Sequence, residues 1–381
     1  MLFRLLLLCL IINSAMITNT AMAETTPPTK EAVGKRLFFD PILSLSRTQS
    51  CASCHDAGQA FVDKRPNATG GASSLGHDGI ALGDRNTPSA GYANQIPPFH
   101  QRADGEYIGG LFWDGRAPDL ETQAGGPPLN PIEMAMPNTH EIRSRLQEDP
   151  YYAASFKQLF GEDIFSSAEA TYEALKASIA AFERTDFFSP FDSKYDRHLK
   201  GEYQLSEQEE LGLTLFFSKQ FSNCNECHQL HKRPLSENET FSDYRYHNIG
   251  VPENKALRAA NKSQTATVDL GLQNNPDVAD EKQKGKFKTP SLRNVAITGP
   301  YMHNGVFNDL ETVVAFYNQY NSKNPKNQIN PETDMPWEAP EVPENIALDL
   351  LKKGAPLDQQ RIDALVAFLK LLTDQRYESL Q

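Results

Sequence analysis

The sequence predicts a mainly α-helical fold made of two halves, related by internal duplication and connected by long loops. Apolar residues at helical spacing are frequent, whereas the alternating pattern of a half-buried strand is rare. Short motifs of the first half also occur in the second half, in the same order. The clearest helix begins near Asp358, and its apolar stripe consists of Ile362, Leu365, Val366, Leu369 and Leu372.

The internal repeat consists of pairs of matching segments. The first pair shares a Leu-Phe-Phe ending, the second shares a Thr-Pro-Ser sequence, and the third shares Leu-Glu-Thr at the start of a predicted helix. Because the order is the same in both halves, we expect two homologous domains, at residues 24–190 and 191–381. The matching segments are 34–39 with 212–217, 87–89 with 289–291, and 114–122 with 304–312.

Long loops separate the predicted helices. Residues 166–184 and 309–320 have helical periodicity, whereas residues 62–105, 236–290 and 322–345 are rich in Gly, Pro, Asn, Asp and Ser and have none. Loops of this length are uncommon in a compact domain. A large apolar cofactor would give them a surface on which to pack.

The N-terminus has the features of a secretory signal peptide. Arg4 provides a positive charge, residues 5–12 form an apolar segment, and an Ala-Met-Ala sequence ending at Ala23 provides a cleavage site. We therefore expect residues 1–23 to be removed after Ala23 and the mature chain to be periplasmic. The apolar segment is too short to cross a bilayer, and no later segment is long enough for a membrane span.

The formal net charge of the sequence is −12 at pH 7. An acidic chain of this kind is not attracted to a phosphate backbone, which argues against nucleic acid as a partner. A small basic patch that faces a redox partner is compatible with this charge.

Four of the five cysteines form two pairs, and each pair is followed directly by a histidine. Disulfides are the usual role of cysteines in an exported protein. The C-x-x-C-H pattern, however, is the attachment signature of c-type haem. Because the two motifs use every cysteine outside the signal peptide, we expect two covalently bound haem c groups and two cytochrome c-like domains. The motifs are Cys51-Ala52-Ser53-Cys54-His55 and Cys224-Asn225-Glu226-Cys227-His228.

Further motifs distinguish the chain from a simple c-type cytochrome. They are Arg-Asn-Thr-Pro at 85–88, Phe-Trp-Asp-Gly-Arg-Ala at 112–117, Leu-Glu-Thr-Gln-Ala at 120–124, Asn-Pro-Ile-Glu-Met at 130–134 and Gly-Pro-Tyr-Met-His-Asn-Gly at 299–305. With these motifs, the sequence resembles the bacterial dihaem cytochrome c peroxidases and the MauG-like dihaem enzymes. The resemblance covers nearly the whole mature chain, from about Val33 to Leu372.

The resemblance implies that the haem on His55 is the peroxide-binding centre. Gln123 and Glu133 match the family's polar residues on its distal side. The amide would orient the peroxide, and the carboxylate would move a proton between its oxygens as general base and then acid. Outside this context, Glu133 would be interpreted as a solvated or helix-capping carboxylate. Trp113 matches a residue that relays electrons between the haems, with core packing as the alternative.

His77 lies in a loop that the resemblance connects with the first haem. In peroxidases of this family, a histidine in this loop caps the haem in the resting oxidised state and leaves when the other haem is reduced. The segment before Arg85 resembles that loop with looser spacing, and a solvent-exposed histidine is an equal alternative. If His77 binds the iron of the first haem, the enzyme needs reductive activation; otherwise the site is open.

The haem on His228 is implied to be the electron-entry centre, and its sixth ligand departs from the usual pattern. Typical peroxidases of the family have a methionine after the Asp-Leu-Glu helix, whereas this chain has Phe-Tyr-Asn at 316–318. Phe-Tyr-Asn matches the MauG-like branch, in which the tyrosine ligates the iron. We therefore expect Tyr317 to be the ligand and, as a hard anionic donor, to lower the potential. Met302 and His303 are the competing ligands, and packing on the haem edge is the alternative role of Tyr317.

The resemblance also implies one calcium ion between the two domains. Asn86 would supply a side-chain oxygen, Thr298 and Pro300 would supply backbone oxygens, and waters would complete the shell. Oxygen donors of this kind suit calcium.

The first functional expectation is a periplasmic peroxidase that reduces hydrogen peroxide to water with electrons from a small cytochrome c or a cupredoxin. Tyr317 favours a second function, the MauG-like oxidation of tyrosine or tryptophan side chains on a partner protein. A dihaem electron carrier without catalysis is the third, and it leaves Gln123 and Glu133 without a role. The donor or protein substrate, the potentials and the oligomeric state, including a homodimer, are left open.

Overall fold

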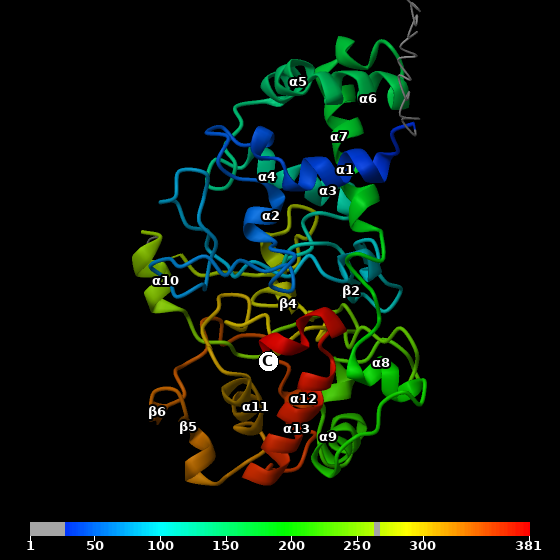
Figure 1. Ribbon diagram of the computed structural model, residues 1–381. Coiled ribbons are helices and arrows are strands. Elements are labelled where there is room, and N and C mark those ends of the chain that lie inside the picture. The colour runs from blue at the N-terminus through cyan, green and yellow to red at the C-terminus, as the bar shows by residue number, and fades with distance from the viewer. Residues whose placement is uncertain (1–26, 263–266) are drawn as a thin grey trace, which may run out of the picture.

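The computed structural model describes residues 27–262 and 267–381 (Figure 1). The predicted signal peptide, residues 1–23, lies outside the described residues. Helices form most of the regular structure in the described part, and the strands there are very short, so the mainly α-helical prediction is confirmed. None of the described helices is both long enough and apolar enough to cross a membrane.

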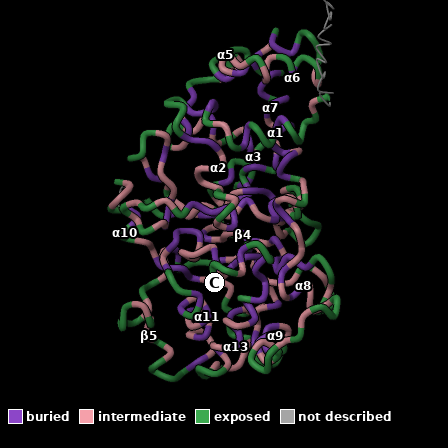
Figure 2. The backbone as a smooth tube through the Cα atoms, in the orientation of Figure 1, coloured by how far each residue is buried: buried purple, intermediate pink, exposed green. Residues whose placement is uncertain are grey.

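Figure 1 shows the helices of the first half at one end of an elongated molecule and most helices of the second half at the other. Exposed segments lie mostly at the periphery (Figure 2). The first half contains α1 (Lys30–Phe39), α2 (Cys51–Cys54), α3 (Leu120–Ala124), α4 (Gly126–Leu129), α5 (Thr139–Glu148), α6 (Pro150–Phe160) and α7 (Ala168–Glu183). The second half contains α8 (Lys194–Leu199), α9 (Glu207–Phe217), α10 (Lys255–Ala260), α11 (Leu310–Asn318), α12 (Leu348–Leu351) and α13 (Gln359–Leu371).

The strands of the described residues form antiparallel pairs of two residues each. They lie in the segments that connect the helices and add little to the core. The pairs are β1 (His100–Gln101) with β2 (Tyr107–Ile108), β3 (Tyr246–His247) with β4 (Phe287–Lys288), and β5 (Ile329–Asn330) with β6 (Met335–Pro336).

The predicted helix near the C-terminus is confirmed, whereas one predicted loop contains a helix. The carboxylate of Asp358 accepts a hydrogen bond from the backbone N–H of Arg361 at 3.0 Å, and α13 begins at the next residue, Gln359. The prediction that residues 236–290 lack helices was wrong, because α10 lies within them. Its cap, Asn254, accepts a hydrogen bond from the N–H of Leu257 at 3.0 Å, so local capping starts a helix too short to show periodicity.

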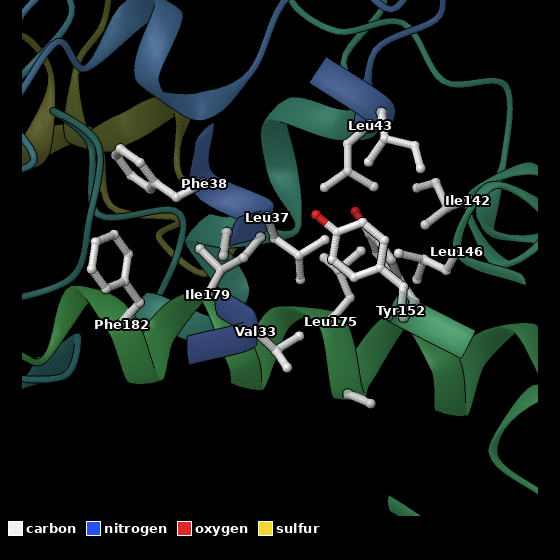
Figure 3. Packing of buried hydrophobic residues seen from close by; sticks show 14 of the residues in the cluster. Val33, Leu37, Phe38, Leu43, Ile142, Leu146, Tyr152, Leu175, Ile179 and Phe182 are labelled. Atoms are coloured by element: carbon white, nitrogen blue, oxygen red, sulfur yellow. The ribbon is translucent and has the colours of Figure 1, made fainter. Parts of the chain in front are cut away.

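Each half has a core in which two helices pack closely through a glycine. In the first half α1 packs on α7, and a Cβ added to Gly34 would lie 1.8 Å from the backbone oxygen of Ser178. In the second half α9 packs on α13, and a Cβ added to Gly212 would lie 1.9 Å from the backbone oxygen of Ala364. Figure 3 shows the first core, where Leu37 and Phe38 of α1 face α7. In each pair the earlier helix also contacts the cysteine motif: α1 contacts α2, and α9 contacts the turn at Cys224.

The C-terminal residues connect the two halves. Tyr377 is buried, and its hydroxyl donates a hydrogen bond to the backbone oxygen of Ala57 at 2.7 Å. The hydroxyl of Tyr92 donates to the carboxylate of Asp374 at 2.5 Å, and the amide of Asn294 donates to the same carboxylate at 2.9 Å. These buried polar contacts fix the relative position of the halves, because breaking one would leave an unsatisfied group in the interior.

Replacement of Gly212 by alanine should destabilise the protein, because the new Cβ would meet the backbone of α13 rather than a movable side chain. We expect the free energy of unfolding to fall by about 1–3 kcal/mol, although alanine is the better helix former. Chemical denaturation of the haem-loaded protein measures this. In the control Gly58→Ala the nearest atom is a side-chain oxygen of Asp56 at 3.3 Å, and the change should stay within about 0.5 kcal/mol. Equal stability of the Gly212→Ala protein and the parent would contradict the packing.

Candidate functional site

The two cysteine motifs form short helical turns that bring their thiols and histidine together. Cys51 and Cys54 begin and end α2, and Cys224 begins a 3-10 turn. The backbone N–H of His55 bonds to the oxygen of Cys51 at 2.9 Å, and that of His228 bonds to the oxygen of Cys224 at 2.8 Å. All four described cysteines carry free thiols.

Both histidines are oriented by a backbone carbonyl. The Nδ1 of His55 lies 3.1 Å from the oxygen of Phe61, and the Nδ1 of His228 lies 3.1 Å from the oxygen of Phe241. Both phenylalanines are fully buried and have positive φ angles, 58° and 57°. A hydrogen bond at Nδ1 fixes the tautomer and leaves Nε2 free to bind a metal. Burial lowers the pKa of both imidazoles, which favours the neutral form that a metal needs.

The Thr-Pro-Ser segments hold the residues that precede these carbonyls. The hydroxyl of Ser89 donates to the backbone oxygen of Ala60 at 2.7 Å, and the hydroxyl of Ser291 donates to that of Thr240 at 2.8 Å. The repeated sequence motif therefore has the same structural task in both halves.

A large cavity lies against each motif. Cavity 1 is lined by Cys51, Cys54 and His55, and cavity 2 by Cys224, Cys227 and His228. Their atom-free space, including the solvent at their mouths, is about 1990 Å³ and about 1710 Å³ respectively.

A covalently attached haem fits each cavity. Its thioether bonds need the two thiols on the cavity wall, and its iron needs a neutral imidazole on the same wall. Both are present in each half. Most of the remaining wall is apolar, as a porphyrin requires, and in cavity 2 it includes Phe216, Val314, Leu365 and Leu369.

Gln123 and Glu133 both lie on the wall of cavity 1. Gln123 is placed by α3, whose cap Asp119 accepts a hydrogen bond from the N–H of Thr122 at 2.8 Å. The amide of Asn130 donates to the carboxylate of Glu133 at 3.0 Å. Burial raises the pKa of Glu133, while the charge of Arg116 and the hydrogen bond from Asn130 oppose the rise. The arrangement offers an amide and a poised carboxyl to a ligand in cavity 1.

Trp113 lies on the walls of both cavities. Its indole N–H donates to the backbone oxygen of Asn86 at 2.8 Å, and its own backbone oxygen accepts the N–H of Lys288 at 2.9 Å. The indole is thereby held in a fixed position between the two haem sites.

Tyr317, Met302 and His303 all line cavity 2, so the structure brings the three candidate ligands together. Tyr317 projects from α11, and burial raises the pKa of its phenol well above the usual range. A cation close to the phenol oxygen in cavity 2 would favour the phenolate against this cost of burial. His303 stacks on Phe287 with ring centroids 3.6 Å apart, and burial lowers the pKa of its imidazole to about 3.

His77 does not line cavity 1. Its Nδ1 lies 2.8 Å from the hydroxyl of Ser46, and its backbone N–H donates to the oxygen of Glu133 at 2.7 Å. The half-buried imidazole is therefore held outside the cavity by Ser46, and the described geometry does not bring it to the haem site.

The residues expected at a calcium ion lie where the two halves meet. The backbone N–H of Asn86 donates to the oxygen of His303 at 2.7 Å. The ammonium of Lys64 donates to the oxygen of Gly299, between Thr298 and Pro300, at 2.5 Å. The oxygens expected to bind calcium carry no charge. None of them is a carboxylate that would offset the positive charge of Lys64.

Sequence reasoning did not single out Asp269 and Lys288, which line both cavities. Asp269 pairs with the guanidinium of Arg85 at 2.6 Å, and Arg85 also bonds Asp114 at 2.6 Å. Burial lowers the pKa of Lys288 to about 7, although Asp114 opposes the shift. Asp269 has no motif near it, whereas Lys288 directly precedes the Thr-Pro-Ser sequence at 289–291; nothing in the sequence marked either residue as part of both cavity walls.

The chain is similar to known dihaem proteins. Residues 28–204 match the family described as di-haem cytochrome c peroxidase. The methylamine utilization protein MauG of Paracoccus denitrificans is 49% identical over 377 residues, which cover 98% of this chain and 97% of that protein. The cytochrome c peroxidase Ccp of Escherichia coli is 33% identical over 77% of this chain and 54% of its own length. The crystal structure of the diheme peroxidase BthA of Burkholderia thailandensis has a TM-score of 0.80, with 32% identity, over 93% of this chain and 89% of that one.

Proposed function

The chain belongs to the family of dihaem cytochrome c peroxidases and MauG proteins, and from this premise we propose that it uses hydrogen peroxide as oxidant in the periplasm. It is an oxidoreductase, and the family implies two haem c groups. Export would follow from the signal peptide at residues 1–23. The proposal rests chiefly on cavity 1, whose wall combines a haem-binding motif with Gln123 and Glu133.

The proposed chemistry is reduction of peroxide to two waters, which takes two electrons and two protons. The haem on His55 supplies the iron that binds peroxide. Gln123 orients the peroxide through its amide. Glu133, as carboxylate, would accept a proton from one oxygen of peroxide and return it to the other, while the haem would supply the electrons that the donor delivers. The partly buried position of Glu133 suits this role. Burial raises the pKa of its carboxyl, so the carboxyl binds the transferred proton more tightly than an exposed glutamate would.

We propose that residues 24–190 and 191–381 are two cytochrome c-like domains that arose by internal duplication. The proposal is supported by the paired hydrogen bonds of the two histidines and of the two Thr-Pro-Ser segments. The close glycine contacts at Gly34 and Gly212 are a further matching pair.

Tyr317 is proposed as the sixth ligand of the haem on His228. Its support is the position on the wall of cavity 2 and the need of a buried phenolate for a cation. Tyrosinate would stabilise the oxidised iron and lower the potential. Trp113, on both walls, is proposed to carry electrons between the two haems.

The two candidate functions differ in the source of the electrons that reduce peroxide. Oxidation of tyrosine or tryptophan side chains on a partner protein is the reaction we favour, because Tyr317 matches the MauG-like branch. The relative named MauG also matches over nearly the full length of both chains. A small cytochrome c or cupredoxin as donor is the second candidate. It is supported by relatives named cytochrome c peroxidase at 30–34% identity.

The remaining proposals concern access and bound ions. We propose that the haem on His55 is open on its distal side, because Ser46 holds the imidazole of His77 outside cavity 1. One calcium ion, with ligands from Asn86, Thr298 and Pro300, is supported by the contact of Asn86 with the segment 298–303.

Replacement of Glu133 by glutamine should slow the reaction of the haem-loaded protein with peroxide by about 10²–10⁴-fold, because an amide cannot accept the proton. The unprotonated carboxylate is the active form. The rate of the parent protein should therefore fall as the pH drops through the pKa of Glu133, and this fall should begin at a higher pH than for an ordinary glutamate.

Stopped-flow mixing with peroxide across pH measures both effects. The control is Glu141→Gln, an exposed glutamate of α5, which should react like the parent. If the Glu133→Gln protein reacts as fast as the parent, or if its rate depends on pH in the same way as that of the parent, the role assigned to Glu133 is wrong.

The two electron sources are distinguished by peroxide consumption with and without a reduced small cytochrome c. A partner-oxidising enzyme should consume peroxide slowly, and the cytochrome should accelerate it by less than about tenfold, because a tyrosinate-ligated haem has a low potential and is a poor electron acceptor. Saturable acceleration by several orders of magnitude would favour the peroxidase instead.

A further inference from the structure

Glu183 is a buried carboxyl that the proposed peroxide chemistry does not use. It is the last residue of α7 and only 5% exposed, and it lies on the wall of cavity 1. Its Oε2 is buried and has no hydrogen-bond partner. Its charge contributes to the raised pKa of the Cys51 thiol, which lines the same cavity. A buried carboxyl without a partner is costly when ionised, so its position calls for an explanation.

The surroundings favour the protonated form of Glu183. Burial is the main cause that raises its pKa, to about 8; Arg184 opposes the rise, and Glu121 adds to it. Arg184 gives little relief, because both of its terminal nitrogens bond to Glu121, at 2.6 and 2.7 Å. The negative end of the α7 dipole also disfavours a carboxylate at this place. The charged groups on the surrounding elements are Lys176 and Arg184 on or after α7, Asp119 and Glu121 at α3, and Lys35 on α1. The wall of cavity 1 adds Asp84, Arg85, Asp114, Arg116, Glu133, Arg258, Asp269 and Lys288.

We propose that Glu183 is the proton acceptor that accompanies reduction of the haem on His55, taking up one proton from solvent for each electron delivered to that haem. The inference rests on the proposed attachment of haem at Cys51 and Cys54. Reduction removes one positive charge from the iron, and in an apolar cavity a nearby proton compensates that change with little screening. The electron comes from the donor or partner protein and the proton from water, so charge and atoms balance.

The end of α7 gives the proton a short route. Glu183 is buried, whereas the next residue, Arg184, is exposed. The carboxyl therefore belongs to the cavity wall, at a helix end where the chain reaches the surface. Glu133 bonds Asn130 elsewhere on the wall. The two carboxyls have separate tasks: Glu133 handles the protons of peroxide, and Glu183 balances the charge of the iron.

The consequence is a pH-dependent potential. Glu183 binds its proton more tightly when the haem is reduced than when it is oxidised. Between these two pKa values, each pH unit should change the reduction equilibrium tenfold, which corresponds to about 59 mV for one electron. The potential should fall as the pH rises through this window, and it should level off when the carboxyl is ionised in both states.

The experiment is a spectroelectrochemical titration of the haem-loaded protein from about pH 6 to about pH 9. The parent should show the slope for the haem on His55, and Glu183→Gln should abolish it, because glutamine cannot ionise. Glu173→Gln is the matched control: its side chain lies on α7, is 68% exposed and pairs with Lys176, so the slope should remain. An unchanged slope in Glu183→Gln would overturn the inference.

A second measurement covers the case in which Glu183→Gln does not fold. Redox-difference infrared spectra of the unmodified protein should contain a carboxylic acid band that appears on reduction and shifts in D₂O. Absence of the band would overturn the inference by itself. Loss of covalent haem at Cys51 and Cys54 would instead contradict the proposed function, and a haem count on the denatured protein separates the two failures.

Discussion

The hydrogen bond from each histidine to a backbone carbonyl is the constraint on which the rest of the structure depends. His55 and His228 can offer a neutral Nε2 to iron only if Nδ1 is held, and Phe61 and Phe241 hold it through carbonyls in tight, buried turns. The Thr-Pro-Ser segments fix these turns through the hydroxyls of Ser89 and Ser291. The helix pairs α1 with α7 and α9 with α13 form the core of each half. The same arrangement in both halves produces two similar cavities, so any difference in reactivity must come from the opposite walls.

The walls differ in the groups they offer. Cavity 1 has an amide and a carboxyl with a raised pKa, together with a second, unpartnered carboxyl at its edge. Cavity 2 has a phenol, an imidazole and a thioether on a mainly apolar wall, which also includes Asp269 and Lys288. Trp113 belongs to both, so the two sites are neighbours although their motifs are far apart in the sequence. Trp113 is therefore placed to carry electrons between the two sites, as proposed above.

The mainly helical fold and the motif residues were predictable from sequence, because periodicity and the C-x-x-C-H spacing report local structure. The helix beginning at Asp358 and the grouping of Gln123 with Glu133 are examples. Contacts between distant segments were not predictable. Ser46 holds the imidazole of His77 outside cavity 1, and Lys288 lies on the walls of both cavities. Glu183 had no signal either, since a glutamate at the end of an amphipathic helix is usually solvated, and its burial results from tertiary packing.

The central claim is that the two haems are unequal, with an open site at His55 and a tyrosinate-ligated site at His228. The electron paramagnetic resonance spectrum of the resting ferric protein tests it most directly, recorded for the parent and for Tyr317→Phe. One high-spin and one low-spin signal are predicted, and only the low-spin signal should change in the variant. Two low-spin signals, or a low-spin signal that is the same in both proteins, would contradict the account.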